Sequence, residues 1–368
     1  MDSREDNEVT KLPPTLIFKV ITVIRNFLYN LYFKFVPANV AVFEKAQRFW
    51  IAKALGVACE LNIADIIDSE PTTINEIAEK SGTLPQPLYR LMRALASDGI
   101  FKETEKQVFV NTPLSKALTE GKGSMKYMIQ HQLNETNWEI INELSYSLKT
   151  GKSAARKLLG TDIFGHLQNH LEKNELYNKA MTNTSDISSA AFVSAYDFSG
   201  IENLIDIGGG EGYLLSMVLK KYKKMQGIVF DLPHVVKTAA ENFIKFGIEN
   251  RATAEAGNFF DKIPKGGDAY ILKNILHAFD DEVCVKILKS IQESINPDGK
   301  LLIIETVIGE DNKPAYGKIF DLQMLLVTDG GKERTRKEFE EIFSKADFKL
   351  NRVVDTVSPF SIVEGVPV

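Results

Sequence analysis

The sequence predicts an α/β protein in which a seven-stranded, mostly parallel sheet with helices on both faces follows a helical, winged-helix-like unit. Three observations support this fold class. From about residue 204 onward, apolar runs of strand length alternate with helical segments, a rhythm that is typical of parallel sheets. A glycine-rich turn follows the first run and precedes a helical segment at Tyr213–Lys221. The chain also has 368 residues, which is too long for one ordinary core and indicates two domains.

The strands of the sheet are expected in the C-terminal half of the chain. Five of them alternate with helical segments, at Leu204–Ile207, Gly227–Phe230, Ala252–Ala256, Ala269–Leu272 and Lys300–Thr306. Two more, near Phe348–Val354 and Phe360–Glu364, would complete the sheet. Because the crossovers are helical, we expect the first five strands to be parallel.

The stretch from Val42 to about Ala117 predicts helices followed by a β-hairpin. Its expected elements are helices at Phe43–Leu55 and Ala58–Ile67 with a break at Gly56, a capped helix from Thr73, a helix at Pro85–Ser97, and strands at Phe101–Glu103 and Val108–Asn111. Thr73 and Glu76 have the spacing of a capping box. Two helices across a glycine turn with a hairpin after them indicate a winged helix. The chain from Gly123 to Asp197 is predicted to be mostly helical.

A winged helix invites a DNA-binding interpretation, which the charge pattern disfavours. The recognition helix of such a unit, Pro85–Ser97, offers only Arg90 and Arg93 to phosphates, whereas DNA binding draws on a cluster of cations. The net charge of −5 is not that of a general polyanion binder. We therefore expect no nucleic-acid partner and a protein-facing use such as dimerisation, and we keep a DNA-binding regulator as an alternative.

Composition and cysteine usage place the chain among ordinary globular proteins. Hydrophobic residues make up 44% and charged residues 25%, which is a common balance. The two cysteines, Cys59 and Cys284, lie far apart, and with no signal peptide this predicts a reduced, cytoplasmic protein. His166 and His170 stand four residues apart without an evident third ligand, so we expect no metal site.

The segment Thr15–Val36 is apolar and aromatic, yet it carries charged and amide side chains. Charges through the span argue against a transmembrane helix. Lys19, Asn26, Asn30 and Lys34 recur at helical spacing, which leaves a wide apolar face opposite them. Such a helix needs a partner, and we expect a subunit interface first and a membrane surface second.

The most informative motif is the glycine-rich turn at 208–212, which reads Gly-x-Gly-x-Gly after Asp206. Glycine lets the backbone approach a ligand closely. Asp231 ends the next apolar run, about 20 residues after the turn, where a carboxylate suits a ribose diol. The spacing is tighter than that of dinucleotide sites, and no Lys-Ser/Thr follows as in triphosphate sites. The motif therefore favours a nucleoside ligand without a pyrophosphate, such as S-adenosylmethionine, over a merely structural turn.

Polar side chains follow the later strands at the same expected edge of the sheet. Asn258 and Phe259 follow the third strand and could contact an adenine. His277 follows the fourth strand, and an imidazole with a pKa near 6.5 suits proton removal near neutral pH. A base needs a partner on its other ring nitrogen, and Glu305 and Glu333 are the candidates. For Glu333 the alternative is a solvated charge run, because Lys332 and Arg334 flank it.

Together these motifs resemble the class I S-adenosylmethionine-dependent O-methyltransferases of the dimeric caffeate, hydroxyindole and polyketide-tailoring type. The resemblance runs from about Phe43 to the C-terminus and is carried by residues 205–212, 230–234, 257–260, 272–277, 304–305 and 331–335. It implies a winged-helix-like dimerisation domain, a Rossmann-like methyltransferase domain and a homodimer. The expected boundaries are an amphipathic extension at 1–37, the dimerisation and substrate-lining domain at 38–185, and the methyltransferase domain at 186–368.

The resemblance also implies site residues. It implies catalytic roles for His277, Glu305 and Glu333. The implied cofactor-binding residues are Asp206, Gly208, Gly210, Asp231, Leu232, Asn258, Phe259, Lys273 and Ser185. The implied residues of the acceptor pocket are Tyr177, Met181 and Met324. The sequence departs from the family pattern after the base, where Ala278 and Phe279 replace the usual Asp and Trp, and at Asn258, where Asp is usual.

We thus expect metal-independent transfer of a methyl group from S-adenosylmethionine to a hydroxyl, most simply a phenolic one, of an aromatic small molecule. A phenol with a pKa near 10 is mostly neutral at pH 7, so the base would remove its proton as the new bond forms. Transfer to an amine, or a tailoring reaction without methyl transfer such as hydroxylation or decarboxylation, is the alternative within the same fold.

Overall fold

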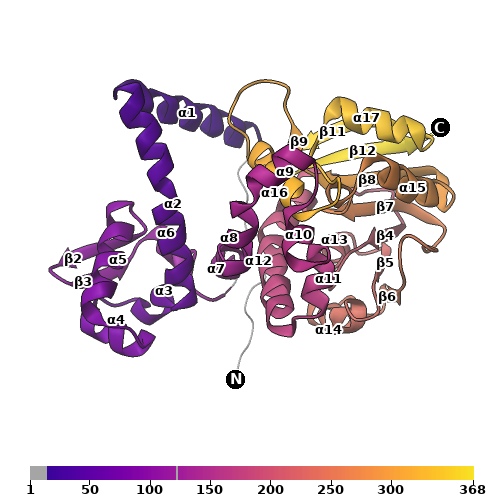
Figure 1. Ribbon diagram of the computed structural model, residues 1–368. Coiled ribbons are helices and arrows are strands. Elements are labelled where there is room, and N and C mark those ends of the chain that lie inside the picture. The colour runs from indigo at the N-terminus through magenta and orange to yellow at the C-terminus, as the bar shows by residue number, and fades with distance from the viewer. Residues whose placement is uncertain (1–14, 122) are drawn as a thin grey trace. The chain divides into compact units, whose positions relative to one another are not determined.

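The computed structural model describes residues 15–121 and 123–368, which form two compact units (Figure 1). The first, called the sheet unit here, contains residues 143–163 and 188–368 and the start of helix α1 (Thr15–Lys34) as far as Val23. The second, called the helical unit, contains residues 24–142 and 164–187. The two units follow from contacts within the chain. The domain boundaries predicted from the sequence, at 37/38 and 185/186, stay predictions.

The sheet unit is built on seven strands in the order β11-β12-β8-β7-β4-β5-β6. They are β4 (Asn203–Ile207), β5 (Gln226–Asp231), β6 (Ala252–Ala256), β7 (Gly267–Lys273), β8 (Ile295–Glu305), β11 (Phe348–Asp355) and β12 (Ser361–Pro367). The pairs among β4 to β8 are parallel, and β12 runs antiparallel to both β8 and β11. The predicted seven-stranded, mostly parallel sheet is therefore confirmed.

The order of the strands places a topological switch point at β4. The chain proceeds from β4 to β5 and β6 on one side and then returns to β7 and β8 on the other. In open α/β sheets, ligands bind at the carboxyl ends of the strands at such a point. The register pairs Ile207 with Phe230, and Lys273 with Ile304, so the glycine turn and the segments after β5, β7 and β8 meet at one edge.

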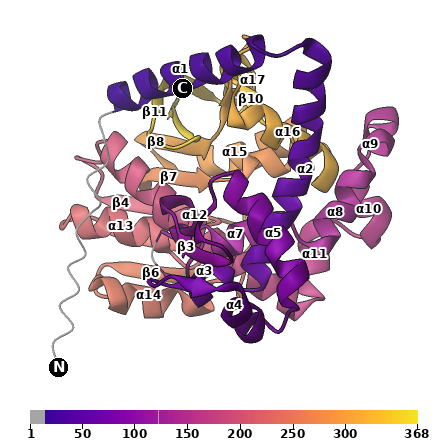
Figure 2. The same ribbon diagram turned by 90° about the vertical axis from the view of Figure 1, so that its left-hand side faces the viewer.

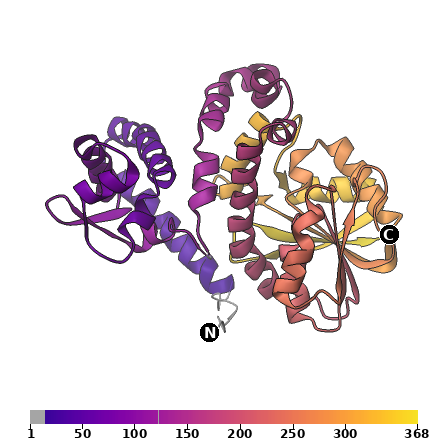
Figure 3. The same cartoon turned by 90° about the horizontal axis from the view of Figure 1, so that it is seen from below.

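Helices cover both faces of the sheet, and Figure 3 shows the strands running between them. One apolar core joins the sheet to α13 (Tyr213–Lys221), α14 (Ala239–Phe246) and the end of α12 (Leu171–Ala195). A second core on the other face joins it to α15 (Asp281–Gln292) and α17 (Arg336–Lys345). The other elements of the unit are α9 (Leu144–Thr150), α10 (Ala154–Leu159), η1 (Val236–Thr238), η2 (Leu276–Ala278), β9 (Val307–Ile308), α16 (Tyr316–Val327) and β10 (Arg334–Thr335).

The helical unit combines helices with a small antiparallel sheet in the order β1-β3-β2, of which Figure 1 labels β2 and β3. Its elements are α2 (Ala38–Glu60), α3 (Ile63–Ile67), β1 (Thr72–Thr73), α4 (Ile74–Ser81), α5 (Pro85–Ser97), β2 (Phe101–Glu105), β3 (Val108–Asn111), α6 (Pro113–Lys116), α7 (Lys126–Gln132), α8 (Glu135–Asn142) and α11 (Ile163–Gln168). The predicted capping box is confirmed, because Thr73 caps α4 reciprocally with Glu76. The helices and hairpin expected of a winged helix are present.

The predicted helix break at Gly56 is wrong. Helix α2 continues through this position to Glu60. Gly56 is buried against Leu133, and a Cβ atom added to Gly56 would lie 2.9 Å from the Leu133 Cβ. The glycine therefore permits close packing of α2 on the segment after α7 and does not end the helix.

Helix α1 confirms the predicted N-terminal helix, with an end at Lys34 where Val36 was expected. None of its residues is buried. It is 20 residues long with a mean hydropathy of 1.3 in its most apolar window, so within residues 15–121 and 123–368 it is the one helix long and apolar enough to cross a membrane. A bend at residues 35–37 separates it from α2 (Figures 1 and 2).

Candidate active site

The glycine turn after β4 adopts backbone conformations that require glycine. Gly208, Gly210 and Gly212 have φ angles of +66°, +61° and +70°. A Cβ atom on Gly208 would lie 2.5 Å from Ile275 Cδ1, whereas one on Gly210 would meet nothing within 4 Å. Gly208 therefore allows the turn to pack against the segment after β7, and Gly210 leaves an open stretch of backbone.

Asp231, at the end of β5, is held by backbone amides from two sides. Its Oδ2 accepts a hydrogen bond of 2.9 Å from the Gly210 amide, and its Oδ1 accepts one of 2.7 Å from the Leu232 amide. Burial raises the pKa of Asp231, and the two amides oppose that shift. Each carboxylate oxygen has a second lone pair, so the fixed carboxylate can still accept bonds from a diol.

Asp206 lies directly beneath the glycine turn, because a Cβ atom on Gly209 would lie 2.6 Å from the Asp206 Cγ. Its side chain is 1% exposed, and neither carboxylate oxygen has a hydrogen-bond partner among the described residues. Burial raises the pKa of Asp206 to about 7 against the opposing effect of Lys273, whose own pKa burial lowers to about 8. A buried polar group without a hydrogen-bond partner is costly. The Asp206 carboxylate is therefore suited to accept hydrogen bonds from a ligand.

The segment after β6 supplies an aromatic wall. The Phe259 ring lies 4.7 Å from Phe260 and 6.2 Å from Phe279, measured between ring centroids. Phe279 thus keeps an aromatic side chain where the family usually has Trp. Asn258 Oδ1 accepts a hydrogen bond of 3.0 Å from the Phe260 amide, which orients the Asn258 side chain.

His277, in the single turn η2 after β7, forms a direct pair with Glu333. The distance from His277 Nδ1 to Glu333 Oε1 is 2.8 Å, and the His277 side chain is largely buried. Thr306 Oγ1 donates to the other oxygen of Glu333, and the Glu333 amide donates to Asp321. A carboxylate on Nδ1 favours the tautomer whose Nε2 carries a lone pair. This arrangement orients an imidazole that can accept a proton.

Glu305 holds the backbone of the base and not its ring. Its Oε1 accepts a hydrogen bond of 2.9 Å from the His277 amide. Its Oε2 is buried without a hydrogen-bond partner among the described residues. Glu305 and Glu333 were both candidates for the partner of the ring, and the structure brings only Glu333 to that position.

The electrostatic environment of His277 favours its protonated form. Burial by itself lowers the pKa of the imidazole. The hydrogen bond that the ring donates to Glu333 and the charges of Glu305 and Glu333 outweigh burial and the opposing charge of Arg334, and they raise the pKa of His277 above its usual value. The site can therefore take up a proton more readily than a free histidine.

The sequence interpretation missed Arg334, which clamps the turn that carries His277. Arg334 is fully buried, and it donates to the carbonyl oxygens of Leu276 (3.0 Å) and Phe279 (2.9 Å) and to Asp281 (2.8 Å). The alternative of a solvated charge run at 332–334 is wrong for Glu333 and Arg334. One signal was available: Thr335 and Glu338 form a capping box, which places the preceding residues in the turn that enters α17.

The predicted acceptor-pocket residues lie on two helices. Met324 is buried on α16, the helix whose Asp321 holds Glu333 and whose Phe320 ring lies 5.4 Å from the His277 ring. The other two, Tyr177 and Met181, lie on the part of α12 that belongs to the helical unit, and so does Ser185, which is predicted to contact the cofactor. Tyr177 packs edge-on against His131 in that unit. The predicted roles of these three residues stay predictions.

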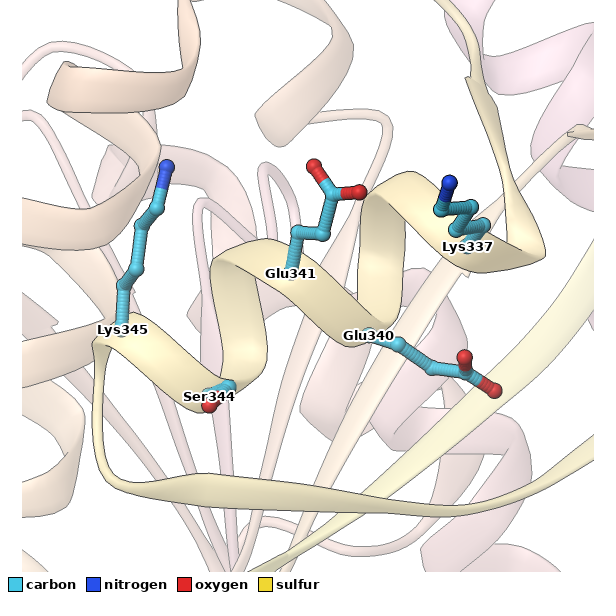
Figure 4. Close-up of a pocket in the computed structure, with 5 residues that line it drawn as sticks. All are labelled: Lys337, Glu340, Glu341, Ser344 and Lys345. Carbon is cyan, nitrogen blue, oxygen red and sulfur yellow. The ribbon is translucent and has the colours of Figure 1, made fainter.

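A surface hollow of about 420 Å³ lies elsewhere on the sheet unit (Figure 4). All of its lining residues belong to one helix, α17: Lys337, Glu340, Glu341, Ser344 and Lys345. It is a groove between side chains of a single helix and joins no residues from different elements. We therefore assign the site to the carboxyl edge of the sheet and not to this hollow.

Comparison with known proteins gives two family matches. Residues 141–349 match the family model of an O-methyltransferase domain, and residues 43–121 match that of an O-methyltransferase dimerisation domain. Phenazine O-methyltransferase PhzM of Lysobacter antibioticus is 37% identical over 335 residues, which are 90% of this chain and 97% of that protein.

Solved structures agree with these matches. The crystal structure of LaPhzM has a TM-score of 0.85 at 37% identity, and the match covers 90% of this chain and 100% of that chain. NcsB1, an O-methyltransferase from neocarzinostatin biosynthesis, was solved with S-adenosylmethionine and 2-hydroxy-5-methyl naphthoic acid. Its TM-score is 0.75 at 28% identity, with 87% of this chain and 96% of that chain covered.

Proposed function

The chain belongs to the S-adenosylmethionine-dependent O-methyltransferases, and we propose that it methylates a hydroxyl group of an aromatic small molecule with His277 as the general base. The observation that carries the proposal is the buried contact between His277 Nδ1 and Glu333 Oε1. An aromatic acceptor is supported by two relatives, one named for phenazine and one solved with a hydroxynaphthoic acid derivative.

The residues around the glycine turn fit the cofactor. When bound, S-adenosylmethionine supplies a methyl group that its sulfonium already activates. We assign the ribose to Asp231, which two amides orient, and the adenine to Asn258 and Phe259. Asp206 has two buried oxygens without hydrogen-bond partners among the described residues, and it would accept from donors at the amino-acid end of the cofactor. The neighbouring Lys273 would donate to acceptors at the same end.

The base acts on the acceptor. A phenol with a pKa near 10 is mostly protonated at pH 7. Neutral His277 would take the proton at Nε2 as the bond from oxygen to the methyl carbon forms, and Glu333 would stabilise the resulting imidazolium. General-base catalysis of this kind contributes ~10²–10⁴-fold to the rate. We propose no metal ion in this step, because the sulfonium activates the methyl group and His277 removes the proton.

Proton removal also distinguishes a hydroxyl acceptor from an amine acceptor. A neutral amine already carries the lone pair that attacks, so a base positioned beside it accelerates the attack only a little.

The family match at residues 43–121 supports a homodimer, which we include in the proposal.

Labelled S-adenosylmethionine and a panel of phenols with the matching anilines test the proposed function. We expect label in the phenols, little label in the anilines, and loss of transfer in His277→Asn. Asp231→Ala serves as the cofactor control, since calorimetry should show weaker binding in this variant only. Transfer to anilines that His277→Asn leaves unchanged would overturn the proposal.

A further inference from the structure

Helix α1 turns its apolar face away from the protein. Its central apolar side chains are each at least half exposed: Ile17, Val20, Ile21, Ile24, Phe27 and Leu28. These six residues, called the apolar face of α1 here, lie within one sector of the helix at 100° per residue. Monomeric soluble proteins rarely expose contiguous apolar surface of this kind without a partner for it.

The opposite side of α1 lies nearer to the rest of the described chain. Phe18, Thr22 and Asn26 on this side are partly buried, and Lys19 forms an ion pair with Asp355. An ordinary surface helix of a soluble protein has the opposite orientation, with its apolar stripe toward the core. Within residues 15–121 and 123–368, no contact buries the six residues of the apolar face of α1.

The charges around this face have one sign. Residues 9–43 contain no Asp or Glu, whereas the whole chain has a net charge of −5. Arg25 and Lys34 form no ion pair with another residue of the described ranges, and they stand at the two borders of the apolar sector. A cationic border beside an apolar face is complementary to an anionic lipid surface.

A second copy of the chain has a different surface to use. The dimerisation family model begins at residue 43, so it includes the exposed apolar residues Phe49 and Trp50 of α2. Helix α1 precedes both family models. The solved relative LaPhzM is matched over its whole length by 90% of this chain, so the shared architecture leaves a tenth of this chain unmatched.

We propose that α1 is a membrane-surface helix that binds anionic bilayers. Its apolar face enters the boundary between headgroups and acyl chains, and Arg25 and Lys34 contact the headgroups. The helix lies in the plane of the surface, because a spanning orientation would place Asn26, Asn30 and Arg25 in hydrocarbon.

Sedimentation of the full chain with lipid vesicles tests this proposal. One set of vesicles is phosphatidylcholine with about one-third phosphatidylserine, and the other is phosphatidylcholine alone. We expect binding to the anionic vesicles that salt weakens, and much less binding to the neutral ones. Ile21→Glu with Leu28→Glu should reduce binding by ~10-fold or more, because each substitution places a charge on the inserted face.

Two controls separate the interpretations. Ile244→Glu alters an exposed apolar residue of α14 in the sheet unit and should bind vesicles like the wild type. Light scattering should give the same mass for the wild type and the Ile21→Glu, Leu28→Glu variant, and both should methylate a soluble acceptor equally. Absent vesicle binding in the wild type, or undiminished binding in the variant, would refute the proposal. Loss of dimer mass in the variant would also refute it, by assigning the apolar face to a second copy.

Discussion

At the scale of single residues, the chemistry depends on how one imidazole is held. Glu333 contacts His277 Nδ1, and Glu333 is itself fixed by Thr306 and by the contact of its amide with Asp321. These contacts fix the orientation of the ring, and the hydrogen bond to Glu333 with the charge of Glu333 helps to raise the pKa of His277 against the effect of burial. Glu305 contributes charge to the same shift while it holds the backbone amide.

Glu333→Gln should lower the pKa of His277, because it removes the carboxylate that bonds the ring. The neutral imidazole would then prevail at lower pH, so the rise of kcat with pH should move to lower pH. The plateau should fall ~10-fold or more, since the amide stabilises the imidazolium less. Glu340→Gln, at an exposed position of α17, is the matched control and should change neither. A profile that stays in place in Glu333→Gln would contradict this role.

The sequence predicted His277 and the glycine turn because each follows a strand end, which sequence patterns reveal. It did not predict the burial of Glu333 and Arg334. Burial of a charge depends on partners that are distant in the chain, here Leu276 and Asp281 for Arg334. From sequence alone, Lys332 to Arg334 resembles any solvated charge run.

At the scale of elements, the turn η2 is defined by contacts to its carbonyl groups. Arg334 donates to the carbonyl oxygens of Leu276 and Phe279, on either side of His277. Gly331 lies against the same turn, since a Cβ atom there would lie 2.3 Å from the His277 carbonyl oxygen. The residues that precede α17 therefore pack against the turn η2 and hold the backbone of His277 in place.

Arg334→Lys keeps the charge but loses the planar fork that reaches both carbonyl groups. We expect the free energy of unfolding to fall by about 1–3 kcal/mol, because buried acceptors are left unsatisfied. Turnover should fall with it, since the turn that carries the base is loosened. Urea unfolding and steady-state rates measure the two effects. Arg336→Lys, at an exposed ion pair, should change stability by less than about 0.5 kcal/mol, and an equal loss in both variants would refute the clamp.

Gly56 gives a second test at this scale. Alanine has a higher helix propensity than glycine by about 1 kcal/mol, so an unconstrained Gly56→Ala would stabilise α2. The added Cβ would lie 2.9 Å from the Leu133 Cβ, and we expect a net loss of about 1–3 kcal/mol. Leu133→Ala should recover part of that loss in the double variant, as urea unfolding can show. A stabilised Gly56→Ala would mean that the segment near Leu133 moves away freely.

Local patterns predicted most elements well and failed where packing decides. The helix Tyr213–Lys221 and the strand Ala252–Ala256 have their predicted bounds, because turn residues border each of them. The predicted break at Gly56 is wrong because sequence alone does not distinguish a glycine that ends a helix from one that allows another segment to pack closely. Only the contact with Leu133 distinguishes them.

At the scale of the whole molecule, the chain divides its roles between two units. The sheet unit holds His277, Glu333 and the glycine turn, and the helical unit contains the whole of the matched dimerisation domain, residues 43–121. Helix α12 contributes residues to both units. The roles predicted for Tyr177, Met181 and Ser185 depend on tertiary placement, which periodicity within a helix does not encode.

We expect a homodimer in solution, with a mass by light scattering of twice the 41.2 kDa of the chain. Trp50→Glu should shift the chain toward monomer, because Trp50 is an exposed aromatic residue within the matched dimerisation domain, and a buried charge there would be costly. Ile244→Glu, on the sheet unit, is the control and should remain dimeric. A monomeric wild type at micromolar concentration would contradict the expectation.

We propose that His277 removes the proton of the acceptor, and a pH profile of His277→Asn beside the wild type tests this step most directly. With a neutral phenol, wild-type turnover should rise with pH through the raised pKa of His277. The variant should lose this rise and turn over ~10²–10⁴-fold more slowly, with unchanged affinity for S-adenosylmethionine. Equal turnover and the same profile in both proteins, at a pH below the pKa of the phenol, would contradict the claim.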